Sequence, residues 1–385
     1  MRRERDADRG TASEAGPVAA PGQGSLPELP GTAAGGPSYG RARTLEEALA
    51  VLAEGAAATA GDRLPVVLAG GTDLVTLWRR NLLRPSRLLD IGRLEALRGM
   101  GPDAEGGWRI GALVTLAELA RAGALPPAYQ ALAEAAGASA TPALRNRATL
   151  GGNLEQRVRC WHFRSGLPCR FAGDGHCSCA APEAAGPFQA IFGHGPGEPG
   201  EGCGAVHPSD PAVALTALGA WVELARWEGG RVGRRWVPVD AYFIGRAAAG
   251  APGLTARRPD ELVTAVVLPP LPEPSTSTYR KVMDRRVWQF ALVSLAAWIR
   301  WAPGPVVEEV RLVLGGVALK PWRLEAVEAW LRGRALDAAT AWEAGERAVE
   351  GARPLAGSGF KVELVRSLVA DTLRDLAARA VATSA

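Results

Sequence analysis

The sequence predicts an α+β protein in which an α/β domain comes first and a smaller α+β domain follows. Strand-like and helix-like segments alternate from residue 44 to about residue 150, which is typical of an α/β unit. In the C-terminal third, strand-like segments come first and helical ones follow, which is typical of an α+β unit. A third observation sets the middle of the chain apart: all cysteines and histidines lie between Cys160 and His207.

The composition is that of an ordinary globular protein with two or three compact units. Hydrophobic residues make up 47% of the 385 residues and charged residues 22%. The net charge of +4 is spread along the chain, which argues against a nucleic-acid partner. No apolar run approaches the roughly 18 residues of a membrane span, so we expect no such span.

Residues 1–40 consist mainly of Gly, Ala, Pro and charged residues. They can bury little apolar surface, so we expect a disordered leader. Arg2 and Arg3 hint at a twin-arginine signal, but the apolar stretch of such a signal does not follow. The expected location is the cytoplasm, or the periplasm by co-export with a partner that carries a signal.

Folding signals begin at Thr44, which forms a capping-box pattern with Glu47 ahead of an apolar helical face. Residues 65–69 then predict a buried strand. The further elements expected in this unit are a helix over 74–82, strands over 87–91 and 108–112, and a helix capped by Thr115 and Glu118.

The C-terminal unit is expected to contain three strands followed by three helices. The strands are predicted over 279–282, 290–301 and 307–314, with the last ending at Gly315-Gly316, and the helices near 324–332, 338–351 and 360–381.

Two turns with paired glycines suggest an anion-binding site. The first turn runs from Ala69 through Leu74 between a strand and a helix, and the second turn spans residues 149–154. Paired glycines let successive backbone N–H groups form a nest for an anion, and a following helix start adds its positive dipole end. A pyrophosphate is the natural occupant, although neither turn is a Walker loop or a G-x-G-x-x-G motif, and a lone Gly-Gly pair is more often simply a tight turn.

The five cysteines indicate a metal ion or an iron–sulfur cluster, because thiolate ligands must converge on one point. Buried non-ligand thiols are one alternative. Disulfides are another, but five is an odd number and no signal peptide precedes the chain. Zinc is a further alternative. Its usual C-x2-4-C and H-x3-5-H spacings are absent, but spacing alone does not decide between zinc and an iron–sulfur cluster.

Several motifs resemble the FAD-binding subunit of molybdenum hydroxylases, the xanthine dehydrogenase and aldehyde oxidoreductase group. They are Ala-Gly-Gly-Thr-Asp-Leu at 69–74, Thr-Leu-Gly-Gly-Asn at 149–153 and Tyr-Arg-Lys-Val at 279–282. The run from Asn153 to Arg164, and His-Pro-Ser-Asp at 207–210 after Cys203, are similar to the branch whose flavoprotein subunit carries an additional 4Fe-4S cluster.

The resemblance runs from about residue 40 to the C-terminus. It implies a two-part α/β FAD-binding domain of PCMH type over 41–270, with a loop at 155–207 that carries the cluster. It also implies a C-terminal α+β domain over 275–385, with a small antiparallel sheet and three helices.

The resemblance also implies which residues hold FAD. The first turn binds the pyrophosphate through Ala69, Gly70, Gly71, Thr72, Asp73 and Leu74, and the second turn supports it through Thr149, Gly152 and Asn153. Asp210 matches an acidic residue that holds polar groups on the flavin side, and Lys281 matches a basic residue near the isoalloxazine. From the residues alone, Asp210 could also be a helix N-cap and Lys281 a solvated surface lysine.

The same resemblance implies Cys160, Cys169, Cys179 and Cys203 as the cluster ligands, with Cys177 in reserve for Cys179. His162 is interpreted as a packing residue or a donor that supports a ligand. No catalytic residue of the chain's own is expected.

The implied function is electron transfer. A large molybdenum-cofactor subunit would oxidise the substrate, and a small 2Fe-2S subunit would pass the electrons to FAD in this chain and on to an external acceptor. A stand-alone flavoprotein oxidase and a zinc-stabilised non-enzymatic scaffold are the alternatives.

Overall fold

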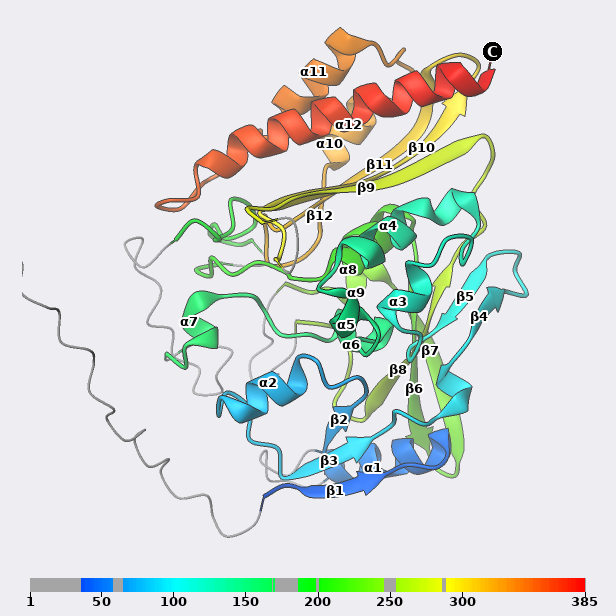
Figure 1. Ribbon diagram of the computed structural model, residues 1–385, viewed down its shortest axis with the longest axis vertical. Coiled ribbons are helices and arrows are strands. Elements are labelled where there is room, and N and C mark those ends of the chain that lie inside the picture. Colours follow the sequence, from blue (N-terminus) through cyan, green and yellow to red (C-terminus); the bar gives the residue numbers. More distant parts are fainter. Residues whose placement is uncertain are drawn as a thin grey trace, which may run out of the picture. The chain divides into compact units, whose positions relative to one another are not determined.

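The computed structural model describes residues 36–57, 65–167, 169, 186–198, 201–245, 254–285 and 289–384 (Figure 1). Most of the expected leader lies outside these ranges, as do Cys177 and Cys179. The three parts of the fold that follow are each built on a separate β-sheet.

A small parallel sheet with the order β1-β3-β2 carries the first glycine turn. Its strands are β1 (Ser38–Arg41), β2 (Val66–Leu68) and β3 (Arg87–Asp90), with the helices α1 (Leu45–Ala57) and α2 (Leu74–Arg79). Because β1 begins at Ser38, ordered structure starts inside the segment that the sequence predicts to be a disordered leader. Strand β2 is half-buried rather than buried as expected.

Helix α1 shows why this region folds as it does. Its residues Leu45, Ala48, Leu49 and Leu52 are buried together, which confirms the predicted apolar face. The predicted capping box is only half formed: Thr44 Oγ1 accepts the N–H of Glu47, but the Glu47 carboxylate accepts the N–H of Arg43 instead of that of Thr44.

The second sheet is antiparallel, with the order β4-β5-β8-β6-β7. Its strands are β4 (Met100–Pro102), β5 (Trp108–Gly111), β6 (Trp221–Glu228), β7 (Arg231–Pro238) and β8 (Glu261–Leu268). Only β5 is predicted from the sequence. Short helices accompany this sheet: α3 (Leu116–Leu119), α4 (Gln130–Ala138), α5 (Pro142–Arg145), α6 (Leu150–Leu154), α7 (Trp161–Arg164), α8 (Asp210–Ala217) and α9 (Val239–Tyr242). The capping box predicted at Thr115 and Glu118 is complete at the start of α3.

The third sheet is antiparallel, with the order β12-β11-β10-β9. Its strands are β9 (Ser275–Val282), β10 (Val293–Ala302), β11 (Val306–Gly315) and β12 (Trp322–Arg323), and its helices are α10 (Glu325–Leu331), α11 (Ala338–Arg347) and α12 (Phe360–Ser384). Figure 1 shows α10, α11 and α12 gathered along this sheet. The predicted α+β fold with a small antiparallel sheet and three late helices is confirmed.

Both faces of β10 are buried, and they belong to different cores. Leu295, Ala297 and Ile299 pack in the core that contains residues of α10, α11 and α12. Ala296 and Trp298, which point the opposite way, pack in the core that contains residues of α4 and α8. The third sheet is therefore covered on two sides, and one of those sides belongs to the part of the chain that precedes β9.

Candidate functional site

The first glycine turn lies between β2 and α2 and requires both of its glycines. Gly71 has a φ of +75°, in the left-handed region that favours glycine. A Cβ atom on Gly70 would lie only 1.9 Å from the carbonyl oxygen of Arg147. Arg147 lies two residues before the start of the second glycine turn, so the fold brings the two turns together.

The backbone of the first turn offers unused hydrogen-bond donors. Within the described part of the chain, the N–H groups of Gly70, Gly71, Thr72 and Asp73 donate no hydrogen bond, whereas that of Val75 in α2 donates to Gly71 O at 3.0 Å. Consecutive unpaired N–H groups bind anions well, because each backbone donor otherwise lacks a partner. The first turn therefore has the donor set predicted for a pyrophosphate.

The second turn is different, and the expectation of free N–H groups there is wrong. Residues 150–154 form the short helix α6, capped by Thr149. The N–H groups of Leu150 and Gly151 donate to Val114 O and Ala112 O at 2.8 and 2.9 Å. Those of Gly152 and Asn153 donate to Thr149 Oγ1 and O at 3.2 and 2.8 Å. The second turn thus supports the first turn with its own backbone donors already used.

Asp73 ties the first turn to the segment that follows the second turn. Its Oδ2 accepts the backbone N–H of Arg157 at 2.9 Å, and its Oδ1 accepts Nη1 of Arg164 at 2.7 Å. Both carboxylate oxygens therefore bind groups of the segment 157–164.

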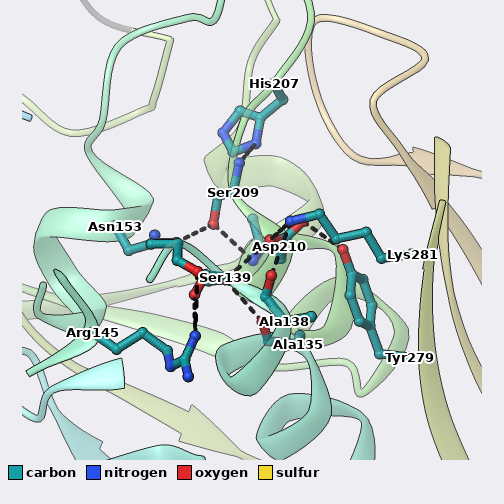
Figure 2. Close-up of polar contacts among 12 residues, drawn as sticks. Ala135, Ala138, Ser139, Arg145, Asn153, His207, Ser209, Asp210, Tyr279 and Lys281 are labelled. Atoms are coloured by element: carbon teal, nitrogen blue, oxygen red, sulfur yellow. Dashed lines mark hydrogen bonds and ion pairs between the residues drawn. The ribbon is translucent and has the colours of Figure 1, made fainter. Parts of the chain in front are cut away.

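Asp210 and Lys281, which the sequence places far apart, form a buried ion pair (Figure 2). Lys281 Nζ lies 2.7 Å from Asp210 Oδ2, and the lysine side chain is only 3% exposed, so it is not a solvated surface residue. Asp210 is not the N-cap of α8. That position belongs to Ser209, whose Oγ accepts the N–H of Ala212 at 3.0 Å.

Two further hydroxyl groups complete the Asp210 site. Tyr279 OH donates to Asp210 Oδ1 at 2.5 Å, and Ser139 Oγ lies 3.0 Å from Oδ2. Burial first, and then the Asp210 carboxylate, raises the pKa of Tyr279 well above its usual value, so the phenol keeps its proton. Neither hydroxyl was predicted from the sequence to have a role. Tyr279 precedes Lys281 by two residues in β9, so strand periodicity could have placed both side chains on the same face.

His207 lies at the start of the segment that leads to Asp210. Burial lowers the pKa of His207 to about 3, so the imidazole is neutral. Its Nδ1 is 3.3 Å from the N–H of Ser209, and Ser209 Oγ lies 2.5 Å from Asn153 Oδ1 of the second turn (Figure 2). A small pocket here is lined by residues 206–210 together with Phe290, Ala291, Ser294, Gly315 and Gly316. The pocket therefore joins the His207–Asp210 segment to the third sheet.

Three of the four predicted cluster ligands share one buried environment. Cys160, Cys169 and Cys203 are thiols in a single apolar cluster with residues such as Leu77 and Phe163. The predicted ligand Cys179 and its alternative Cys177 lie outside the described residues. Among the residues that the structure describes, no three His, Cys, Asp or Glu side chains are placed to hold a metal ion. The Nδ1 atom of His162 is buried and makes no hydrogen bond to a described residue.

None of the described helices is both long enough and apolar enough to span a membrane.

The fold belongs to a class of two-domain flavoproteins, as matches to two domain families show. Residues 33–271 match the model of the FAD binding domain in molybdopterin dehydrogenase. Residues 278–376 match the model of the CO dehydrogenase flavoprotein C-terminal domain. The chain belongs to the family of FAD-binding subunits of molybdenum hydroxylases.

Individual relatives agree with this assignment. The aldehyde oxidoreductase FAD-binding subunit of Escherichia coli K12 is 38% identical over 335 residues, which cover 84% of this chain and 96% of that protein. The xanthine dehydrogenase FAD-binding subunit of Escherichia coli O157:H7 is 24% identical, covering 89% and 97%. Among solved structures, a carbon monoxide dehydrogenase from Hydrogenophaga pseudoflava has the same fold, with a TM-score of 0.65, 23% identity and coverage of 91% and 98%.

Proposed function

We propose that this chain is the FAD-containing electron-transfer subunit of a multi-subunit molybdenum hydroxylase. The observation that carries the proposal is the first turn, whose N–H groups from Gly70 to Asp73 make no hydrogen bond to the described residues. The pyrophosphate of FAD would accept these donors, with Ala69 and Leu74 at the ends of the turn. When bound, FAD supplies a carrier that takes up one or two electrons.

The second turn has a supporting role in this proposal. Thr149 caps α6 through the N–H of Gly152, and Asn153 contacts Ser209 in the segment that contains Asp210. Lys281 and Asp210 would form the polar surroundings of the isoalloxazine, with their positions fixed by each other. No acid–base or nucleophilic residue of this chain is needed.

The proposed partners are a small 2Fe-2S subunit and a large molybdenum-cofactor subunit. Relatives carry names such as carbon monoxide dehydrogenase medium chain and nicotine 6-hydroxylase medium subunit, which describe one subunit of a larger assembly. Electrons would enter from the 2Fe-2S subunit and leave to an external acceptor. We propose the domain limits 41–270 and 275–385, and a location in the cytoplasm or, by co-export, in the periplasm.

We further propose that the chain carries a 4Fe-4S cluster on Cys160, Cys169, Cys179 and Cys203. Three of these thiols are buried among the same apolar side chains. Such an environment would shield an iron–sulfur cluster from water. The described segment from Arg157 to Leu167 contains three arginines and no acidic residue, which suits the negative charge of a thiolate-bound cluster.

Co-expression with the two candidate partner subunits, followed by size-exclusion chromatography and a visible spectrum, tests the function. We expect one stable complex with the absorption of flavin and iron–sulfur centres. A chain that stays alone and oxidises an aldehyde or a purine at full rate with a dye would instead support a stand-alone oxidase. A colourless protein with stoichiometric zinc would support a scaffold.

A further inference from the structure

Two carboxylates and three arginines meet where the first turn contacts the segment after the second turn. Glu155 Oε2 lies 2.7 Å from Arg257 Nε, and Asp73 Oδ1 lies 2.7 Å from Arg164 Nη1. Each carboxylate therefore already has an arginine of its own. The third arginine, Arg157, is close enough to interact electrostatically with all four members of these two pairs.

Glu155 has little capacity left for another cation. Besides Arg257, its carboxylate accepts the hydroxyl of Thr255 at 3.0 Å and that of Tyr242. Asp73 is similarly occupied, because its second oxygen accepts the backbone N–H of Arg157. Neither carboxylate forms a salt bridge with the Arg157 guanidinium.

The backbone of Arg157 is fixed, but its side chain has no partner in the described part of the chain. The N–H donates to Asp73, and the carbonyl oxygen accepts Nη2 of Arg164 at 2.8 Å. Burial is the main reason why the pKa of Arg157 is lowered. The carboxylates of Glu155 and Asp73 oppose this shift, and the charges of Arg257 and Arg164 add to it. The guanidinium is thus a half-buried positive charge that makes no hydrogen bond or salt bridge to a described residue.

A charge withdrawn from water is costly when no opposite charge pairs with it. The N–H groups of Gly70 to Asp73 also lack a partner, because no described residue accepts a hydrogen bond from them. The hydrogen bond from the backbone N–H of Arg157 to the Asp73 carboxylate links Arg157 to the first turn, and the same carboxylate interacts electrostatically with the Arg157 guanidinium. An anion bound at the first turn would satisfy both.

We propose that Arg157 binds the pyrophosphate of FAD together with the first turn. This inference rests on the proposed FAD-binding function and adds a side-chain anchor to the backbone donors. A planar guanidinium can donate two parallel hydrogen bonds to phosphate oxygens, which adds orientation as well as charge. Exposed arginines in the same region, such as Arg80, remain solvated and therefore need no bound anion to compensate their charge.

The test measures FAD affinity of the apoprotein within the co-purified complex, by titration of flavin fluorescence. Arg157→Gln should raise the Kd for FAD at least tenfold, and Arg157→Lys should recover part of the loss because it restores the charge. Arg80→Gln is the matched control, since it removes an exposed positive charge at the end of α2. Its Kd should stay within twofold of the unchanged protein.

ADP and riboflavin serve as competitors that carry only one part of FAD. Arg157→Gln should weaken competition by ADP, which has the diphosphate, and leave that by riboflavin unchanged. If Arg157→Gln leaves the Kd for FAD unchanged but lowers the iron content, the Arg157 charge serves the iron–sulfur cluster and the proposal is overturned. Equal loss of FAD in Arg157→Gln and in the Arg80→Gln control would also overturn it. An unchanged protein that holds no FAD at all would overturn the proposed function itself.

Discussion

Asp210 in α8 and Lys281 in β9 join the two halves of the chain through an ion pair of 2.7 Å, with side chains only 7% and 3% exposed. Tyr279 and Ser139 add hydrogen bonds to the same carboxylate. Such a pair is stable because each buried charge is compensated by the other, and removal of one partner leaves the other uncompensated.

Asp210→Asn should therefore destabilise the protein by about 3–5 kcal/mol, the usual cost of leaving a buried charge unpaired. Urea unfolding followed by tryptophan fluorescence measures this change. Asp371→Asn is the control, because the Asp371–Arg374 pair is exposed and should change stability by less than about 1 kcal/mol. Similar losses in both variants would contradict the role of the buried pair.

Substitutions in the first turn should remove FAD and leave the C-terminal half folded. Gly71→Val forces a β-branched residue to a φ of +75°, and Gly70→Ala places a methyl group against the Arg147 carbonyl. Flavin released by acid is the readout. Gly101→Ala is the control, since its Cβ would meet no atom within 4 Å. Full flavin content in Gly71→Val would show that the first turn is not the phosphate site.

The cysteine assignment predicts different iron contents for five single variants. Serine at 160, 169, 179 or 203 should lose or damage a cluster of about four irons and four labile sulfides, and Cys177→Ser should keep it. Iron and sulfide are measured after anaerobic purification. Full iron in Cys179→Ser together with loss in Cys177→Ser would exchange these two residues as the third ligand.

His207 should make stability depend on pH in acid. Its pKa is about 3 in the folded protein against 6.5 in the unfolded chain. The unfolded state therefore binds more protons between pH 6.5 and 3, so stability falls as the pH is lowered through this window. The loss should reach at most about 4 kcal/mol near pH 3. The difference in unfolding free energy between the unchanged protein and His207→Gln, measured from pH 7 to 4, should shrink towards acid. A constant difference would show that His207 does not cause the effect.

Acid release also distinguishes how FAD is held. We expect noncovalent binding, because no cysteine or histidine adjoins either glycine turn. Acid precipitation should leave the flavin in the supernatant. Flavin that remains with the precipitated chain would contradict this expectation.

The sequence predicted the fold best where a local signal and a long apolar pattern agreed. The C-terminal strands and helices and the α3 capping box were found for this reason. Strands β6, β7 and β8 were not found, although they form most of the second sheet. Their neighbours in the sheet are distant in sequence, and local periodicity does not identify such pairings.

The candidate site shows the same limit. The Gly-Gly pairs marked both turns, but only the hydrogen bonds of Leu150 to Asn153 reveal that the second turn has no free donors. Asp210 and Lys281 were each singled out, yet nothing local indicates that they bind each other. That contact depends on how the third sheet packs against α8, which is a property of the tertiary fold.

Strand β10 has a consequence for how this protein can vary. Its alternate residues Ala296 and Trp298 fill the core of the FAD-binding half, while Leu295 and Ala297 fill the core beneath the late helices. Neither half can be exchanged for that of a distant relative without a mismatch in this shared layer. Chimeras that swap one half alone should need compensating changes along β10. Substitutions in the two halves are therefore expected to be coupled during evolution.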